Sequence, residues 1–203
     1  MSISNNLIII ATDPQQDPRQ FVPPSGQAWT SLGELERSGK YKNVFTQDPI
    51  EPRMWSMVTE PQVGIGQRAI FLQAEHGNVL WDCLTWIDQE TIDWINDKGG
   101  LKAIVISHPH FYATHLDWAA TFSCKVYLAK ADEEWLSRPD ADNQRVLLME
   151  DNTEIWPDGP RALIPGGHFP GSAVLLWNKM LFVADTIMAV PVGSDPFCTH
   201  VGN

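Results

Sequence analysis

The apolar positions of this chain follow two periods, one typical of strands and one of helices. Residues Arg68–Ala74 and Asn78–Leu84 are rich in β-forming side chains and flank a turn-like Glu75-His76-Gly77, which predicts a β-hairpin. In Asp88–Lys98 the apolar side chains recur at helical spacing, and a pair of glycines follows as a stop signal. Lys102–Ser107 is a continuous β-branched run, which predicts a strand buried on both faces.

The alternation of strands and helices continues towards the C-terminus. We predict helices over Thr114–Phe122 and Ala131–Ser137, and strands over Lys125–Ala129, Arg161–Ile164 and a hairpin Ala173–Val183 that turns at Asn178-Lys179. This alternation favours an α/β layered sandwich. Residues 1–50 contain frequent proline and glycine and little periodicity beyond the strand-like Leu7–Ile10, so we interpret them as an irregular N-terminal arm before a domain over residues 51–203.

Composition and charge restrict the function. Twenty-five acidic and fourteen basic side chains give a formal charge of −11, with no basic cluster, so nucleic acids and anionic membranes are disfavoured partners and a small-molecule substrate is favoured. Three widely spaced cysteines, Cys83, Cys124 and Cys198, indicate neither a disulfide framework nor a cysteine zinc site. We therefore expect a reducing, cytoplasmic location, and no apolar run is long enough for a signal or a membrane span.

Three histidines and an aspartate stand at predicted strand ends. His108 and His110 end the buried strand, His168 lies among glycines and prolines between two strands, and Asp185 follows an apolar strand. Zinc binds converging imidazole and carboxylate groups, so together these residues predict a metal site. Taken singly, each has another interpretation: a strand-end histidine bonded to the backbone, or Asp185 as a turn or cap residue.

The order of these motifs resembles the metallo-β-lactamase superfamily. The motifs are Asn78–Asp82, Ser107–His110, Gly167–Ser172 and Leu181–Thr186, within a similarity over roughly residues 55 to 190. The amino-acid sequences of Gln20–Gln27 and Ser107–Trp118 are similar to those of an uncharacterised fungal and bacterial branch of this superfamily. The resemblance implies an αββα fold, an α+β sandwich, with zinc held by the three histidines and Asp185. Relatives in that branch often begin with a cysteine knuckle, but Ala11–Asp17 contains no cysteine, so no zinc is expected there.

The chain departs from the family pattern at the second metal site. Tyr112 and Ala113 stand where the family's motif has an aspartate and a histidine, so we expect one metal ion per chain. His115 is a candidate substitute ligand if it turns towards the site, and otherwise a surface or helix-capping residue. Few residues follow Asp185, and His200 lies in a context unlike the family's late ligand, so the chain is expected to be shortened and to lack the final elements. Exposed sheet edges would then favour pairing into a homo-oligomer.

Three functions remain open on these residues. The first is a metal-dependent hydrolase in which zinc-bound hydroxide attacks a lactone, lactam, ester or thioester, with Asp185 as fourth ligand or base and Tyr112 donating to the oxyanion. The second is an impaired or regulatory homologue that binds metal without turnover, and the third is a mononuclear iron oxidoreductase. Specificity is expected in loops around Met54–Gln67 and Phe111-Tyr112. The tryptophans at 55, 81, 86 and 118 are expected in the core.

Overall fold

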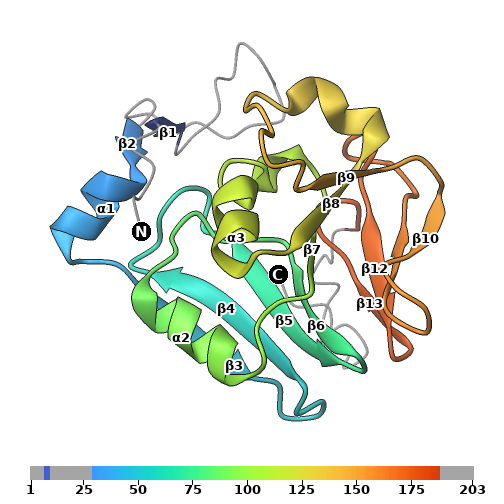
Figure 1. The fold of residues 1–203 in the computed structure, drawn as a ribbon, viewed down its shortest axis with the longest axis horizontal. Coiled ribbons are helices and arrows are strands. Elements are labelled where there is room, and N and C mark those ends of the chain that lie inside the picture. Colours follow the sequence, from blue (N-terminus) through green and yellow to red (C-terminus); the bar gives the residue numbers. More distant parts are fainter. Residues whose placement is uncertain (1–6, 10–28, 188–203) are drawn as a thin grey trace, which may run out of the picture.

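The computed structural model describes residues 7–9 and 29–187. Two sheets pack against each other, and helices cover the outer face of the larger sheet (Figure 1). A small two-stranded sheet contains β1 (Leu7–Ile9) and β2 (Trp29–Ser31). The large sheet contains β3 (Lys42–Gln47), β4 (Met54–Glu60), β5 (Arg68–Ala74), β6 (Gly77–Trp81), β7 (Ala103–Val105), β8 (Lys125–Ala129) and β9 (Arg145–Leu148). The second sheet contains β10 (Asn152–Glu154), β11 (Arg161–Leu163), β12 (Val174–Trp177) and β13 (Met180–Phe182). The helices are α1 (Leu32–Ser38), α2 (Gln89–Asp97), α3 (His115–Phe122) and the 3-10 helices η1 (Pro109–Phe111) and η2 (Lys130–Trp135).

The large sheet changes from antiparallel to parallel along its width. Its seven strands follow the order of the chain, with β3 to β6 antiparallel and β6 to β9 parallel. Each parallel connection must return across the sheet, and α2 and α3 are the crossover helices before β7 and β8. The carboxyl ends of the parallel strands therefore meet at one edge, where ligand sites of such sheets collect.

Alternating side chains give the large sheet two buried faces. Phe71, Leu80 and Ile104 belong to a core cluster with Ile95 of α2 and Trp118 of α3. Their sequence neighbours point the other way and pack against the second sheet: Leu72, Val79 and Val105 share a second cluster with Ala162 and Leu175. The described residues thus form three layers, helices, sheet and sheet, and the second helical layer expected for an αββα sandwich is not among them.

Most elements predicted from residue 68 onwards are confirmed. Strands β5 and β8 have the predicted bounds, and α2 and α3 lie within one residue of theirs. The late hairpin turns at Asn178 and Lys179, both with positive φ, as the turn prediction requires. The segment Ala131–Ser137 forms the 3-10 helix η2 instead of an α-helix, and its non-helical Asp132 interrupts the helical dihedrals.

The expectation of an irregular arm up to residue 50 is wrong for residues 29–47. Helix α1 forms there because Ser31 and Glu34 make a reciprocal capping box, and β3 pairs with β4 along six residues. The supposed specificity loop Met54–Gln67 begins with β4, an inner strand of the large sheet, so only its second half is a loop. The four tryptophans expected in the core are all buried.

Several sequence features lie outside the described residues: Ala11–Asp17, Gln20–Gln27, Cys198 and His200. Among the described residues, Cys83 and Cys124 are free and buried. In the described part of the chain, no helix has the length and apolar character that a membrane crossing requires.

Candidate metal centre

Three segments carry the four candidate ligands to one place. His108 comes three residues after β7, and His110 lies in the 3-10 helix η1 that follows. His168 is in the loop between β11 and β12, and Asp185 comes three residues after β13. The large sheet and the second sheet both contribute, so the cluster lies where the two sheets meet.

The ligand atoms are close enough to share one ion. Asp185 Oδ2 lies 3.4 Å from His108 Nε2, 3.7 Å from His110 Nδ1 and 3.7 Å from His168 Nε2. All four ligand atoms lie within 4.8 Å of one another. Tetrahedral zinc with bonds of about 2.0 Å separates its ligand atoms by about 3.3 Å. The predicted convergence of the three histidines is therefore confirmed, and a small inward movement would complete the coordination.

A hydrogen-bonded relay fixes the orientation of His108. Asp82 accepts from the backbone N–H of Ser107 at 2.7 Å and from its hydroxyl at 3.0 Å. Because the serine proton points to Asp82, the 2.8 Å contact between Ser107 Oγ and His108 Nδ1 requires the imidazole to donate. His108 Nε2 then carries the lone pair, and this buried atom forms no hydrogen bond among the described residues. An imidazole prepared in this way fits a metal ion.

The loop that carries His168 is fixed by two polar groups. Ser172 Oγ accepts from the backbone N–H of Phe169 at 2.8 Å, and Asp132 Oδ1 accepts from that of Gly171 at 2.8 Å. Gly171 has no space for a side chain, since a Cβ there would lie 2.8 Å from Asp132 Cγ. Asp132 is completely buried and was not among the residues singled out from the sequence. The sequence around Asp132 does not indicate this role, because the Gly171 N–H that it accepts from is 39 residues away.

Charge and exposure differ across the cluster. The rings of His108 and His110 hold the pKa of Asp185 well below its usual range, and burial lowers the pKa of His108. Burial raises the pKa of Asp82 to about 7, opposed by the Ser107 hydrogen bonds and increased by the charge of Asp185. The side chain of Asp185 is 55% exposed, whereas that of His108 is 1% exposed. The cluster therefore opens to solvent on the Asp185 side.

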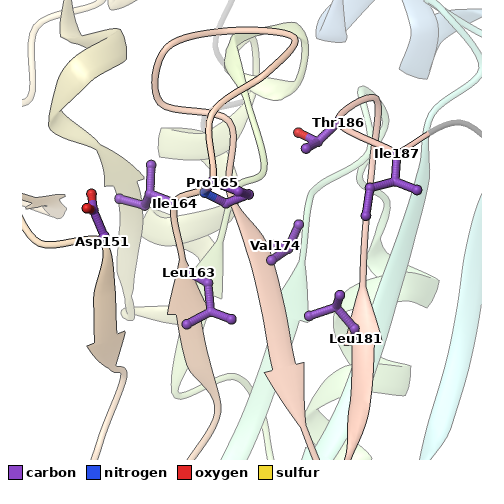
Figure 2. Close-up of a pocket in the computed structure, with 8 residues that line it drawn as sticks. All are labelled: Asp151, Leu163, Ile164, Pro165, Val174, Leu181, Thr186 and Ile187. Atoms are coloured by element: carbon purple, nitrogen blue, oxygen red, sulfur yellow. The ribbon is translucent and has the colours of Figure 1, made fainter.

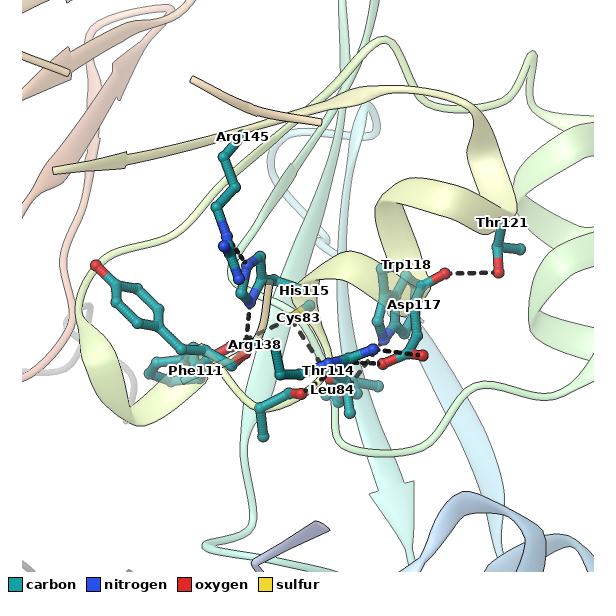
Figure 3. A network of polar contacts seen from close by, with 12 residues as sticks. Cys83, Leu84, Phe111, Thr114, His115, Asp117, Trp118, Thr121, Arg138 and Arg145 are labelled. Carbon is teal, nitrogen blue, oxygen red and sulfur yellow. Dashed lines mark hydrogen bonds and ion pairs between the residues drawn. The ribbon is translucent and has the colours of Figure 1, made fainter. Parts of the chain in front are cut away.

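Tyr112 and His115 lie in the helix-side core. Tyr112 is buried, and burial raises the pKa of its phenol above the usual value, so the phenol stays protonated. His115 is also buried, and both its ring nitrogens are hydrogen bonded, to the Tyr112 carbonyl and to Arg145 (Figure 3). The surface position expected as one alternative is therefore wrong. In the described part of the chain, His115 is absent from the cluster of potential ligands.

An apolar hollow of about 480 Å³ adjoins the loops of two ligands and was not anticipated from the sequence (Figure 2). It is lined by Asp151, Leu163, Ile164, Pro165, Val174, Leu181, Thr186 and Ile187. Thr186 and Ile187 directly follow Asp185, and Thr186 donates a 3.4 Å hydrogen bond to the carbonyl of Gly166. Leu163, Val174 and Leu181 alternate with the inward-facing Ala162, Leu175 and Phe182, so the hollow lies on the outer face of the second sheet.

Solved structures establish the fold. DIM-1 metallo-β-lactamase superposes with a TM-score of 0.51 and 17% identity over 66% of each chain. TMB-1 gives 0.51 and 16% over 66% of this chain and 64% of that one. A flavoprotein from Thermotoga maritima gives 0.50 and 12% over 76% of this chain and 46% of its own. The chain therefore has the metallo-β-lactamase fold, and its His/Asp cluster could bind a metal.

Sequence comparison adds one relative, an uncharacterised protein, YmaE, of Bacillus subtilis. It is 40% identical over 164 residues, which are 81% of this chain and 58% of YmaE. The chain thus spans a little over half the length of this curated relative and about two thirds of the solved lactamases. No family model matches the chain.

Proposed function

We propose that this chain is a metal-dependent hydrolase that holds one zinc ion through His108, His110, His168 and Asp185 and acts on a small carbonyl substrate. The observation that carries the proposal is the convergence of four ligand atoms from three segments within 4.8 Å. Three imidazole nitrogens and one carboxylate oxygen are a donor set that suits zinc.

Asp185 and Tyr112 are the proposed catalytic residues. When bound, zinc lowers the pKa of a water ligand towards about 7 and polarises a carbonyl group. Asp185 is the most exposed of the four side chains, so its carboxylate is placed to orient an incoming water molecule as well as to bind the ion. The raised pKa of Tyr112 keeps its phenol protonated, which suits a hydrogen-bond donor and excludes a base at neutral pH. Its donation to an oxyanion stays a prediction.

Charge supports a neutral or cationic carbonyl compound as substrate. The formal charge of −11 disfavours polyanions. Lactones, lactams, esters and thioesters all meet this description, and they share the scissile carbonyl that the centre would attack.

The direct test combines metal analysis with a hydrolysis screen. The purified full chain is dialysed, its metal content is measured, and it is then assayed with lactone, lactam, ester and thioester substrates. We expect one zinc ion per chain and turnover that is lost on chelation and restored by zinc. Zinc without turnover of any of these substrates would indicate a metal-binding homologue, and iron in place of zinc would indicate an oxidoreductase.

A further inference from the structure

Three successive backbone carbonyls after His110 each accept a hydrogen bond from a side chain, and two of the three donors come from distant parts of the chain. The pairs are Cys83 Sγ with the Phe111 carbonyl at 3.5 Å, His115 Nδ1 with that of Tyr112, and Arg138 with that of Ala113 at 3.2 Å. These carbonyls lie where the backbone leaves η1 and enters α3. The loop that presents His110 is therefore anchored directly behind the ligand.

Arg145 determines which way the His115 bond runs. Its Nε donates to His115 Nε2 at 2.8 Å, and since a guanidinium keeps its protons, Nε2 must be the accepting nitrogen. Burial, together with the charges of Arg145 and Arg138, lowers the pKa of His115 to about 4, so the ring is neutral at pH 7. A neutral imidazole has one N–H, which is then on Nδ1 and donates to the Tyr112 carbonyl.

Arg145 is itself held in place by the start of β9. The carboxylate of Asp140 accepts from the backbone N–H groups of Gln144 and Arg145, each at 2.8 Å. Nearby, Arg138 pairs with Asp117 of α3. Figure 3 shows His115 between Arg145 and the loop, with the Arg138–Asp117 pair at the start of the helix. The edge strand of the large sheet is thus connected to the ligand loop through one imidazole.

We propose that Arg145, acting through His115, is a positioning residue for the metal ligand His110. The inference rests on the proposed metal centre. Without the Arg145 donor, the buried Nε2 of His115 loses its hydrogen bond, so the ring is no longer held where its Nδ1–H meets the Tyr112 carbonyl. A ring that moves to find another donor would release the loop and displace the Nδ1 atom of His110. Arg145 therefore acts on the geometry and affinity of the centre without touching the ion.

The test measures metal geometry and affinity in the folded protein. Arg145→Met removes the donor, and Arg145→Lys keeps an N–H donor for His115. For wild type and both variants, Co²⁺ is titrated into the metal-free full chain, its visible absorption is recorded as a report of coordination geometry, and Zn²⁺ affinity is measured by chelator competition. We expect Arg145→Met to weaken Zn²⁺ binding about tenfold, at the lower end of the effects of outer partners, and to change the Co²⁺ spectrum. Arg145→Lys should restore most of both.

Arg161→Met is the matched control. Arg161 pairs with Glu154 and Asn152 on the second sheet, so its loss should leave the Co²⁺ spectrum unchanged. Should Arg145→Met fail to fold, the pair His115→Leu and His115→Asn provides the test. His115→Leu removes the donor to the Tyr112 carbonyl and should change the Co²⁺ spectrum, whereas the amide of His115→Asn can donate to that carbonyl and should restore it.

Two sets of outcomes separate the inference from the proposed function. A wild-type spectrum and affinity in Arg145→Met, an equal loss in the Met and Lys variants, or a wild-type spectrum in His115→Leu would overturn the positioning role. Failure of the wild type to bind either Co²⁺ or Zn²⁺ would overturn the proposed metal centre itself, and the positioning role with it.

Discussion

The hydroxyl of Ser107 lies between a buried carboxylate and a candidate metal ligand. It connects the buried carboxylate of Asp82 to the ring of His108, and its one proton decides the tautomer of the imidazole. Because Asp82 is buried, any loss of its hydrogen bonds leaves a polar group without compensation. Metal affinity and local stability at this point therefore depend on the same atom.

Ser107→Ala should weaken zinc binding by about 10- to 100-fold, the range found when outer partners of a ligating histidine are removed. The methyl side chain cannot accept from His108 Nδ1, so the ring loses its fixed tautomer. Chelator competition on the folded variant measures the effect. Ser38→Ala is the control, because Ser38 donates to a backbone carbonyl of α1, which carries no ligand. Equal zinc affinity in Ser107→Ala and wild type would show that the relay does not orient His108.

His168→Ala should abolish retention of metal after dialysis, whereas His76→Ala should leave it unchanged. His168 supplies one of the four clustered ligand atoms, and His76 is an exposed residue in the turn between β5 and β6. Elemental analysis of both variants beside wild type measures the difference. Retention of one metal ion by His168→Ala would remove this histidine from the ligand set.

Elements with a strong local period were predictable, and those stabilised by distant partners were not. The run Lys125–Ala129 and the helix before Gly99 carry their own signals, so β8 and α2 appear where expected. By contrast, β9 is a four-residue edge strand whose side chains are mostly half-buried, which gives no clear alternation. Similarly, His108 could be recognised as a ligand from its strand end, whereas the structural role of His115 depends on Arg145, 30 residues away. Sequence motifs therefore locate the ligands but not the groups that hold them.

Helix α1 depends on its N-terminal cap more than on its length. Seven residues are too few for a stable isolated helix, so the capping box of Ser31 and Glu34 and the burial of Leu32 and Leu35 must hold it. Both leucines pack with Val63 and Trp86, which belong to loops beside the large sheet. This segment thus belongs to the folded structure and not to a separate arm.

Ser31→Ala should lower the free energy of unfolding by about 1 kcal/mol, the usual cost of removing an N-cap hydroxyl. Urea unfolding of the full chain measures the change. Ser137→Ala is the control, because Ser137 is exposed and outside regular structure, and its effect should stay within about 0.5 kcal/mol. If the two variants were equally stable, the Ser31 cap would contribute nothing to the stability of the domain.

The two sheets share both a core and the candidate metal centre. One cluster joins Leu72 and Val105 of the large sheet to Leu175 and Trp177 of the second sheet. At the end of this interface, His108 and His110 follow β7 of the large sheet, and Asp185 follows β13 of the second sheet. An ion bound there therefore links segments that are far apart in the chain, and its binding free energy adds to the stability of the sandwich.

Zinc should consequently stabilise the whole domain against unfolding. At a free zinc concentration of 100 times the dissociation constant, linkage predicts about 2.7 kcal/mol of added stability. Thermal or urea unfolding of the metal-free chain, with and without zinc, measures this gain, and the midpoint should rise as zinc is added. His168→Ala should show no such rise, because it lacks one of the four ligands. If zinc raised the midpoint of His168→Ala as much as that of wild type, the ion would be binding elsewhere on the acidic surface. The cluster between the two sheets would then not be the metal-binding site.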